Sequence, residues 1–323
     1  MGGRVENSFA SLARLRNPYQ TDLNVLECQF MKQTGPSLVA SYTFPGASFL
    51  NNHETRFNLI VNADDFGPNA DVSKAILDAF TNGVVTSTSV IINMRAAEPW
   101  INELAKRSLP AGIHLNIFSG QPVSPLSQVR SLVDDTGQFR RFSSISEMET
   151  QIDTAELLIE FRSQTAKLKY FGISPTHIDV HRHEIYFCPR LFAVVAELAQ
   201  EMLLPLRMPL ECNLERYGKA LASLAGWSTD DLKELQTKIR TICNTKSIKH
   251  PTSFVPDLML NEKVSRETLF ESLTLVPSGV TEICTHPSYA SERGLYELHI
   301  LKQLQAAITE LKIKFEPASF KNV

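Results

Sequence analysis

The chain is predicted to form an α/β fold of the (β/α) barrel type with mainly parallel strands. Short apolar runs of strand length alternate with longer stretches of helical periodicity, and polar residues follow several of the short runs. A length of 323 residues is compatible with one closed α/β barrel plus an extension. The contents of 43% hydrophobic and 21% charged residues are typical of a water-soluble protein with a large core.

The strand and helix patterns follow one another along the chain. The predicted strands are residues 57–63, 85–92, 111–117, 176–181, 204–208 and 279–284, with a short one near 313–315. The predicted helices are residues 70–82, 98–107, 144–171, 189–202, 230–242, 265–275 and 292–311. Because each connection between strands is long enough for a helix, the repeated units imply a parallel sheet, open or closed into a barrel.

The first 56 residues differ from the rest in composition. They contain Gly-Gly, Asn-Pro, Gly-Pro and Pro-Gly pairs, which break regular structure, and show no sustained periodicity. They also show no hydrophobic stretch of the kind found in secretion signals. We expect residues 1–56 to form a poorly ordered extension and residues 57–323 to form a single functional domain.

Charge and cysteine content exclude several classes of protein. A net charge of -3 gives no indication of nucleic-acid or anionic-membrane binding. No apolar run approaches the roughly 18 residues of a membrane span. The five cysteines form no CxxC pair, so neither a zinc knuckle nor a disulfide framework is indicated. Free thiols in a reducing compartment, the cytoplasm, are therefore expected.

The most informative segment is residues 177–183, with the sequence HIDVHRH. In a strand, side chains alternate between faces, so His177, Asp179, His181 and His183 would share one side. Imidazole and carboxylate groups converging on one face suit a divalent metal. The alternative is a polar strand edge whose histidines are satisfied by hydrogen bonds.

Two adjacent carboxylates, Asp64 and Asp65, end the first predicted strand. Neighbouring strand residues face opposite ways, but a turn at Phe66-Gly67-Pro68 can bring both into one site. In such a pair, one carboxylate can bind a metal and the other can act as a base. The alternative is an Asx turn that caps the following helix.

Single histidines mark two further strand ends. His114 and Asn116 alternate with apolar residues on the third strand, and His286 precedes a proline that ends a late strand. Each histidine alone is more often structural than functional. Together with Asp64, Asp65 and His181, however, they lie at or near carboxyl ends of parallel strands, where α/β active sites form. One carboxylate and two imidazoles there would leave positions open for water and substrate.

Several motifs, in this order, resemble the YdjC-like family. They are residues 61–67 (VNADDFG), 84–89 (VVTSTS), 112–116 (GIHLN), 175–183 (PTHIDVHRH), 207–209 (RMP) and 285–287 (THP). The resemblance runs from about residue 57 to the end of the sequence. It implies a metal-dependent carbohydrate deacetylase with a (β/α) barrel-like fold related to polysaccharide deacetylases. N-acetylated sugars of the chitooligosaccharide type are the implied small-molecule substrates.

The resemblance also implies roles for individual residues. The implied metal ligands are Asp65, His114 and His181. The implied catalytic residues are Asp64 as general base, His286 as general acid, and Arg207, which would orient Asp64 or hold the substrate. Residues implied to support the ligands or to contact substrate are His177, Asp179, His183 and Asn116.

The metal and the oligomeric state are less constrained. The ligand set suits zinc, and also magnesium, manganese or iron when waters complete the shell, and the resemblance favours Mg²⁺ with Zn²⁺ as the alternative. Family members commonly form homodimers, although no interface is visible in the sequence. Ile185 and Ser288 depart from the family's usual residues, and we expect them to alter specificity rather than abolish activity.

Two other functions remain compatible with these residues. The same metal chemistry could hydrolyse another ester, amide or phosphoester. A non-catalytic carbohydrate-binding descendant of the fold is the third possibility. Such a binding protein would have no need of Asp64, so retention of this residue favours an enzyme.

Overall fold

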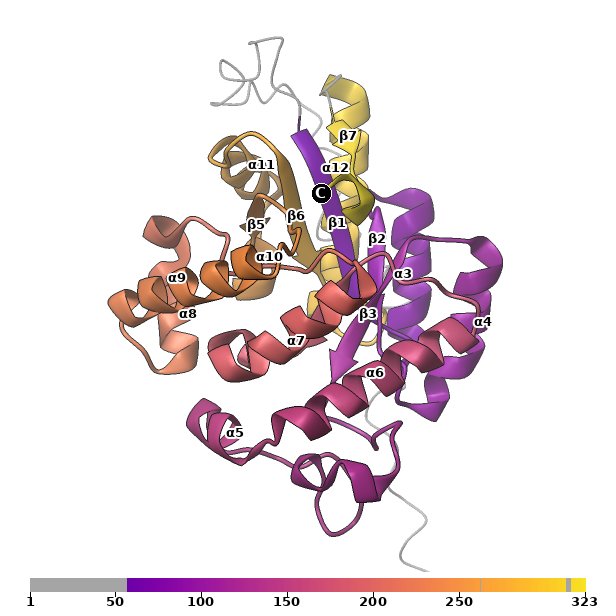
Figure 1. Cartoon of the computed structure of the whole chain (residues 1–323). Coiled ribbons are helices and arrows are strands. Elements are labelled where there is room, and N and C mark those ends of the chain that lie inside the picture. The colour runs from indigo at the N-terminus through magenta and orange to yellow at the C-terminus, as the bar shows by residue number, and fades with distance from the viewer. Residues whose placement is uncertain (1–56, 262, 312–314) are drawn as a thin grey trace, which may run out of the picture. The chain divides into compact units, whose positions relative to one another are not determined.

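Parallel strands form a curled sheet that helices cover on its outer side (Figure 1). The computed structural model describes residues 57–261, 263–311 and 315–323, and the predicted extension at residues 1–56 lies outside this range. The sheet has the order β4-β3-β2-β1-β6-β5, and β7 pairs with the start of β1. The strands are β1 (Phe57–Phe66), β2 (Ser87–Val90), β3 (Ala111–Asn116), β4 (Ile178–His181), β5 (Ser253–Val255), β6 (Val280–Thr285) and β7 (Phe315–Pro317). Every pairing between these strands is parallel, as the alternating pattern predicts.

The helices begin at residues suited to capping. Asn69 accepts hydrogen bonds from two backbone N–H groups at the start of the first helix, and Ser228 forms a capping box. The longer helices are α3 (Ala70–Asn82), α4 (Glu98–Arg107), α6 (Thr154–Tyr170), α7 (Pro189–Met202), α8 (Leu214–Ala225), α9 (Thr229–Thr245) and α12 (Glu292–Leu311). The shorter ones are α5 (Ile145–Gln151), α10 (Asp257–Leu260) and α11 (Arg266–Thr274). None of the helices in the described residues is both long and apolar enough to cross a membrane.

The two faces of the strands differ in polarity. Side chains of the outer face join the main apolar core with the helices; they include Leu59, Val61, Ile113, Leu115 and Ile283. Side chains of the inner face are buried but polar; they include Asn62, Asp64, His114, Asp179 and Glu282. Because side chains alternate along a strand, this apolar–polar alternation directs a set of ionisable groups into the barrel.

An irregular segment connects the two edges of the curled sheet. The Arg207 N–H donates to the Ile178 carbonyl of β4 at 3.0 Å, and the Phe254 N–H of β5 donates to the Glu211 carbonyl at 2.6 Å. The predicted strand at residues 204–208 was wrong in detail, because this segment makes only one bridge to β4, at Leu206. Prolines at 205 and 209 lack the N–H groups that a regular strand needs.

Residues near the C-terminus close the amino end of the barrel interior. The Ala318 N–H donates to the Leu59 carbonyl of β1 at 2.9 Å. Phe320 is buried, and its ring stacks on His177 with the centroids 3.6 Å apart. Together with Ile60, these side chains form a small apolar cluster separate from the main core. Among the described residues, these side chains cover the polar interior at the amino ends of the strands.

Some predicted elements differ from the structure. The predicted helix at 144–171 is two helices, because Asp153 accepts hydrogen bonds from the N–H groups of Ala155 and Glu156 and starts α6 afresh. Strand β2 is shorter than residues 85–92, and β5 and α8 were not predicted. Residues 312–314, in the region of the last predicted strand, lie outside the described range.

Candidate active site

The predicted site residues meet at the carboxyl ends of the strands. Asp64 and Asp65 lie near the end of β1, His114 on β3, His181 at the end of β4, and His286 directly after β6. Contacts below 4 Å connect all five side chains, of which Asp64 and His114 are buried.

A local change in backbone conformation brings both adjacent carboxylates into the site. Asp65 has a left-handed backbone with φ of 68°, and the pairing of β1 with β2 shifts register between Ala63 and Phe66. Asp is among the residues that tolerate this conformation. The turn therefore rotates Asp65 towards the side that Asp64 already faces. The helix-cap alternative does not apply, because Asn69 caps α3.

Asp65, His114 and His181 form a compact set of potential metal ligands. Asp65 Oδ1 lies 2.9 Å from His181 Nδ1 and 3.4 Å from His114 Nε2, and the three ligand atoms lie within 4.8 Å of one another. The other ring nitrogen of His114, Nδ1, donates to Asp179 Oδ1 at 2.8 Å. That bond fixes the orientation of the ring and directs Nε2 towards Asp65, as in many metal sites.

The chemistry of this set fits a divalent metal. Asp65 Oδ1 is buried and has no hydrogen bond of good geometry among the described residues. Its negative charge lies close to the two imidazoles, and its ability to accept a hydrogen bond is unused. Burial opposes ionisation of Asp65, but His114 and His181 hold the pKa of its carboxyl well below the usual range. Burial likewise lowers the pKa of His114, but Asp179, with Asp65, raises it to about 10. One carboxylate with two imidazoles is a common donor set for catalytic metals.

The described residues contain two other groups of potential ligands, and one of them shares His114 with this set. They are Asp64 with Cys284 and His286, and Asp64 with His114 and Asp179. Both include Asp64, whose two oxygens already accept hydrogen bonds from a guanidinium. A cation bound there would be repelled by that positive charge, so the set containing Asp65 is the better candidate.

Arg207 holds Asp64 in a bidentate ion pair inside the barrel. Its Nη1 donates to Asp64 Oδ2 at 2.6 Å and its Nη2 to Asp64 Oδ1 at 2.7 Å, with both side chains almost fully buried. Burial would raise the pKa of Asp64, but Arg207 lowers it to about 2. Asp64 is therefore ionised at neutral pH, with its carboxylate plane fixed by the fork of the guanidinium.

Glu282 is a further member of this group that the sequence-based prediction missed. Arg207 Nε donates to Glu282 Oε1 at 2.6 Å, and Glu282 Oε2 is buried without a partner among the described residues. Burial raises the pKa of Glu282 to about 7 in spite of the bond from Arg207. The alternation along β6 was the available signal, because it places Glu282 and Cys284 on the same face of the strand, just before His286.

His286 approaches the same oxygen of Asp64 that the potential ligand His114 approaches. Its Nε2 is 3.9 Å from Asp64 Oδ2, and about a third of its side chain is exposed. The backbone N–H of His286 donates to Glu297 Oε2 at 2.6 Å. The ring is therefore within reach of both Asp64 and a molecule bound at the opening.

The predicted supporting residues have different environments. Asp179 bonds His114 and accepts from Ser89 Oγ at 2.5 Å, and Ser89 also contacts His177 Nε2 at 3.2 Å. His177 is therefore connected to His114 through Ser89 and Asp179, and its ring stacks on Phe320.

His183 and Asn116 contact residues other than the potential metal ligands. His183 packs near Tyr186 and Phe254, and burial, followed by the charge of Arg207, lowers its pKa to about 3. Asn116 is fully buried, and its amide bonds Asn93 and the loop that follows β3. Its side chain therefore shapes that loop and is not exposed to a substrate.

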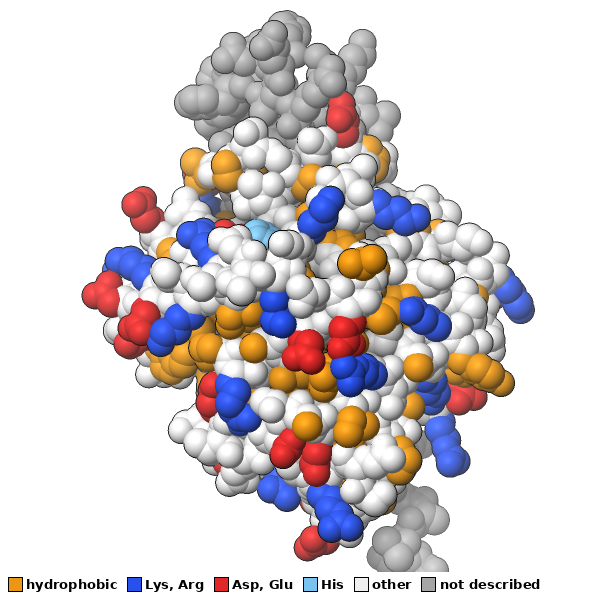
Figure 2. All heavy atoms as spheres, viewed as in Figure 1, with side chains coloured by type: hydrophobic (Ala, Val, Ile, Leu, Met, Phe, Trp, Pro, Cys, Tyr) orange, Lys and Arg blue, Asp and Glu red, His pale blue; other side chains and the backbone are white. Residues whose placement is uncertain are grey.

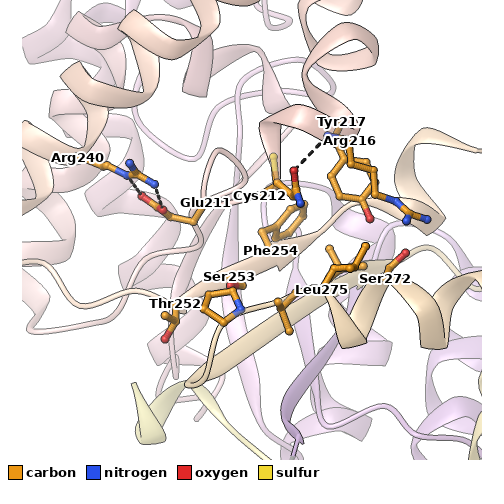
Figure 3. Close-up of a pocket in the computed structure, with 14 residues that line it drawn as sticks. Glu211, Cys212, Arg216, Tyr217, Arg240, Thr252, Ser253, Phe254, Ser272 and Leu275 are labelled. Carbon is orange, nitrogen blue, oxygen red and sulfur yellow. Dashed lines mark hydrogen bonds and ion pairs between the residues drawn. The ribbon is translucent and has the colours of Figure 1, made fainter. Parts of the chain in front are cut away.

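Two hollows lie near the barrel. One of about 680 Å³ is lined by Phe118, Phe142, Arg182 and Glu184, among others, and Arg182 directly follows the potential ligand His181 in sequence. Another, of about 260 Å³, lies between β5 and α8 (Figure 3). Neither hollow is lined by Asp64, Asp65, His114, His181 or His286. In the second hollow, Arg240 and Glu211 pair with each other at 2.6 Å. On the face that Figure 2 shows, basic and acidic side chains of the described residues are interspersed.

The chain is similar to a known protein family, to proteins named as deacetylases and to one solved structure. The sequence model of the family described as YdjC-like protein matches residues 58–316. A carbohydrate deacetylase from Clostridium beijerinckii is 42% identical over 263 residues, which cover 80% of this chain and 94% of that protein. A chitooligosaccharide deacetylase from Yersinia pestis is 36% identical over 169 residues, 50% of this chain and 63% of that protein. A crystal structure of a putative cellobiose-phosphate cleavage protein from Enterococcus faecalis has a TM-score of 0.64 at 26% identity, covering 83% of this chain and 98% of that one.

Proposed function

Because the chain belongs to the YdjC-like family, we propose that it is a metal-dependent hydrolase that removes acetyl groups from N-acetylated sugars of the chitooligosaccharide type. The observation that carries the proposal is the position of Asp64. This carboxylate is fixed by Arg207 beside a three-residue set that fits a metal, and it also faces His286. Residues 57–323 would form the catalytic domain.

Asp65, His114 and His181 would hold the metal, with Mg²⁺ favoured and Zn²⁺ as the alternative. When bound, a divalent ion supplies Lewis-acid polarisation of the acetyl carbonyl and increases the acidity of water. Asp179 supports this set by bonding His114, and Ser89 and His177 support Asp179 in turn.

Asp64 and His286 would carry the two proton transfers. Asp64 Oδ2 lies 3.9 Å from both His114 Nε2 and His286 Nε2, so it borders the place where water and the acetyl group would meet. As an ionised carboxylate it can accept a proton from the attacking water. His286 can then donate a proton to the departing sugar amine, which is a poor leaving group until it is protonated.

The hollow of about 680 Å³ would receive the sugar. Its lining combines the rings of Phe118 and Phe142 with the charged groups of Glu184 and of Arg182, the residue that follows His181 in sequence. Flat apolar surfaces beside hydrogen-bonding groups suit a sugar ring, which has both kinds of surface. The cytoplasm is the proposed compartment, since the cysteines in the described part of the chain are all free. A homodimer stays a prediction.

Acetate release tests the proposed function. N-acetylglucosamine and its short oligomers would be incubated with the purified protein, with metal-stripped protein, and with stripped protein resupplied with Mg²⁺ or Zn²⁺. We expect release that disappears on stripping and returns with metal. Absence of release by protein that binds metal stoichiometrically would instead favour another ester, amide or phosphoester substrate, or a non-catalytic binding protein.

Metal affinity should depend on pH through His114. In the metal-free protein its pKa is raised to about 10, so the ring is protonated at neutral pH, and Nε2 must lose that proton to bind metal. The apparent dissociation constant should therefore fall about tenfold for each unit of pH between roughly 7 and 9, with release of one proton. The folding stability of the metal-free protein should depend on pH in the opposite direction. The stabilisation that protonated His114 contributes is complete below pH 6.5 and is lost as the pH rises through about 10.

Calorimetric titration with metal, in buffers of different ionisation enthalpy, would measure both affinity and proton release. Asp179→Asn is the informative comparison, because Asp179 is the largest factor that raises the pKa of His114. In that variant the steep region should move to lower pH. A metal affinity that is constant between pH 7 and 9 would contradict this account of the ligand set.

A further inference from the structure

Glu297 is a buried carboxylate to which the proposed reaction gives no role. It lies in the second turn of α12, the long yellow helix in Figure 1, and its side chain is only 2% exposed. Its Oε2 accepts two hydrogen bonds from the end of β6, from Thr285 Oγ1 at 2.8 Å and from the His286 backbone N–H at 2.6 Å. A single oxygen therefore fixes the two residues at which the strand passes into the loop.

The second oxygen of Glu297 is also engaged. Oε1 accepts from Arg293 Nε at 3.0 Å, and Arg293 Nη2 donates to the carbonyls of Leu258 and Met259 in α10. The carboxylate is thus bonded on both sides, and a buried charge with this many donors has a well-defined position. Helix α10, helix α12 and the end of β6 are joined through it.

The loop after His286 also packs closely against the first turn of α12. A Cβ placed on Gly294 would lie 2.4 Å from the Ser288 Cβ, so only glycine fits here without a shift of the loop. The side chain of His286 has no comparable support, since its Nδ1 has no hydrogen-bond partner among the described residues. The position of the ring therefore depends on the backbone that Glu297 holds.

We propose that Glu297 is a positioning residue, which fixes the backbone of His286 so that its imidazole reaches the leaving group over Asp64. The inference rests on the proposed function, in which His286 is the general acid. Loss of the Glu297 contacts would let the loop move, and a displacement of about 1 Å at a reacting group can cost on the order of 10²-fold in rate. The effect should be confined to the step that needs a proton donor.

Two substrates separate this step from the others. Cleavage of an N-acetylated sugar requires protonation of the amine, whereas 4-nitrophenyl acetate releases a stable phenolate without a proton. For Glu297→Gln we expect kcat for acetate release from the sugar to fall roughly 10- to 100-fold, with KM changed by less than about twofold. Hydrolysis of 4-nitrophenyl acetate should stay within about twofold of wild type. His286→Ala should show the same selectivity with a larger loss.

Glu160→Gln is a matched control, because Glu160 is also buried and also accepts two backbone N–H groups from a loop, those of Val123 and Ser124. Its ratio of amide to ester hydrolysis should equal that of wild type, whatever its stability. Arg293→Gln leaves Oε2 of Glu297 in place, so its ratio of amide to ester hydrolysis should lie between those of wild type and Glu297→Gln. If Glu297→Gln does not fold, this variant tests the positioning role.

The outcomes distinguish the inference from the function on which it rests. The positioning role alone would be overturned if Glu297→Gln lowered the rate equally on both substrates. It would also be overturned if the ratio of amide to ester hydrolysis in both Glu297→Gln and Arg293→Gln equalled that of wild type. Failure of the wild-type, metal-loaded protein to cleave any N-acetylated sugar would overturn the proposed function and the inference with it.

Discussion

Replacement of Asp64 with asparagine is expected to leave metal binding intact and to lower kcat for acetate release by about 10²- to 10⁴-fold. The amide keeps the shape of the side chain and still offers Arg207 one oxygen, but it cannot accept a proton from water. Metal binding should persist because the proposed ligands are Asp65, His114 and His181. The measurement pairs acetate release with metal content after dialysis.

Two comparisons make this result specific. Asp65→Asn should lose metal as well as activity, whereas Asp71→Asn, on the exposed start of α3, should retain both. A variant at Asp64 that loses metal would move this carboxylate into the ligand set. One that keeps more than about a tenth of wild-type kcat would exclude it as the base.

Replacement of Arg207 with leucine should give the largest loss of stability of any single change at the site. The guanidinium is fully buried and lies within 3.1 Å of Asp64, Asp179 and Glu282. Without the guanidinium, the carboxyl groups of Asp64, Asp179 and Glu282 lie buried together and lose the positive charge that they share. Breaking a buried ion pair in this way costs about 3–5 kcal/mol, so we expect a large fall in the free energy of unfolding or failure to fold.

Urea denaturation of the metal-loaded protein would measure this loss. Arg162→Leu is the matched control, because Arg162 pairs with Glu201 on the surface, where both side chains are partly exposed. That change should cost less than about 1 kcal/mol. Similar losses in the two variants would mean that the buried carboxyl groups are stabilised by something other than Arg207.

The order of strands and helices was predictable because it depends on local signals. Apolar runs followed by polar residues located β1, β3, β4 and β6, and capping residues such as Asn69 mark where helices begin. The three-residue β5 is too short to show a period, and its position depends on pairing with β6 rather than on its own sequence. The missed break before α6 depends on one side chain, Asp153, inside an otherwise helical pattern.

The site was predictable to the extent that it follows from strand ends. The structure brings Asp65, His114 and His181 together, although their roles stay predictions. The rotation of Asp65 into the site depends on a positive φ that composition does not reveal. Glu297 could not be found from sequence, because its contact with His286 arises only when α12 packs against the end of β6.

The long-range pairing of β1 has a consequence for synthesis of the protein. Asp64 leaves the ribosome early, but its partner Arg207 follows 143 residues later, and the neighbouring Cys284 follows 220 residues later. A nascent chain that ends before β6 leaves an edge of its central strand unpaired and the carboxylate network incomplete. The carboxylate network around Arg207 is thus completed late in translation, and a chain that ends before β6 is expected to be prone to aggregate.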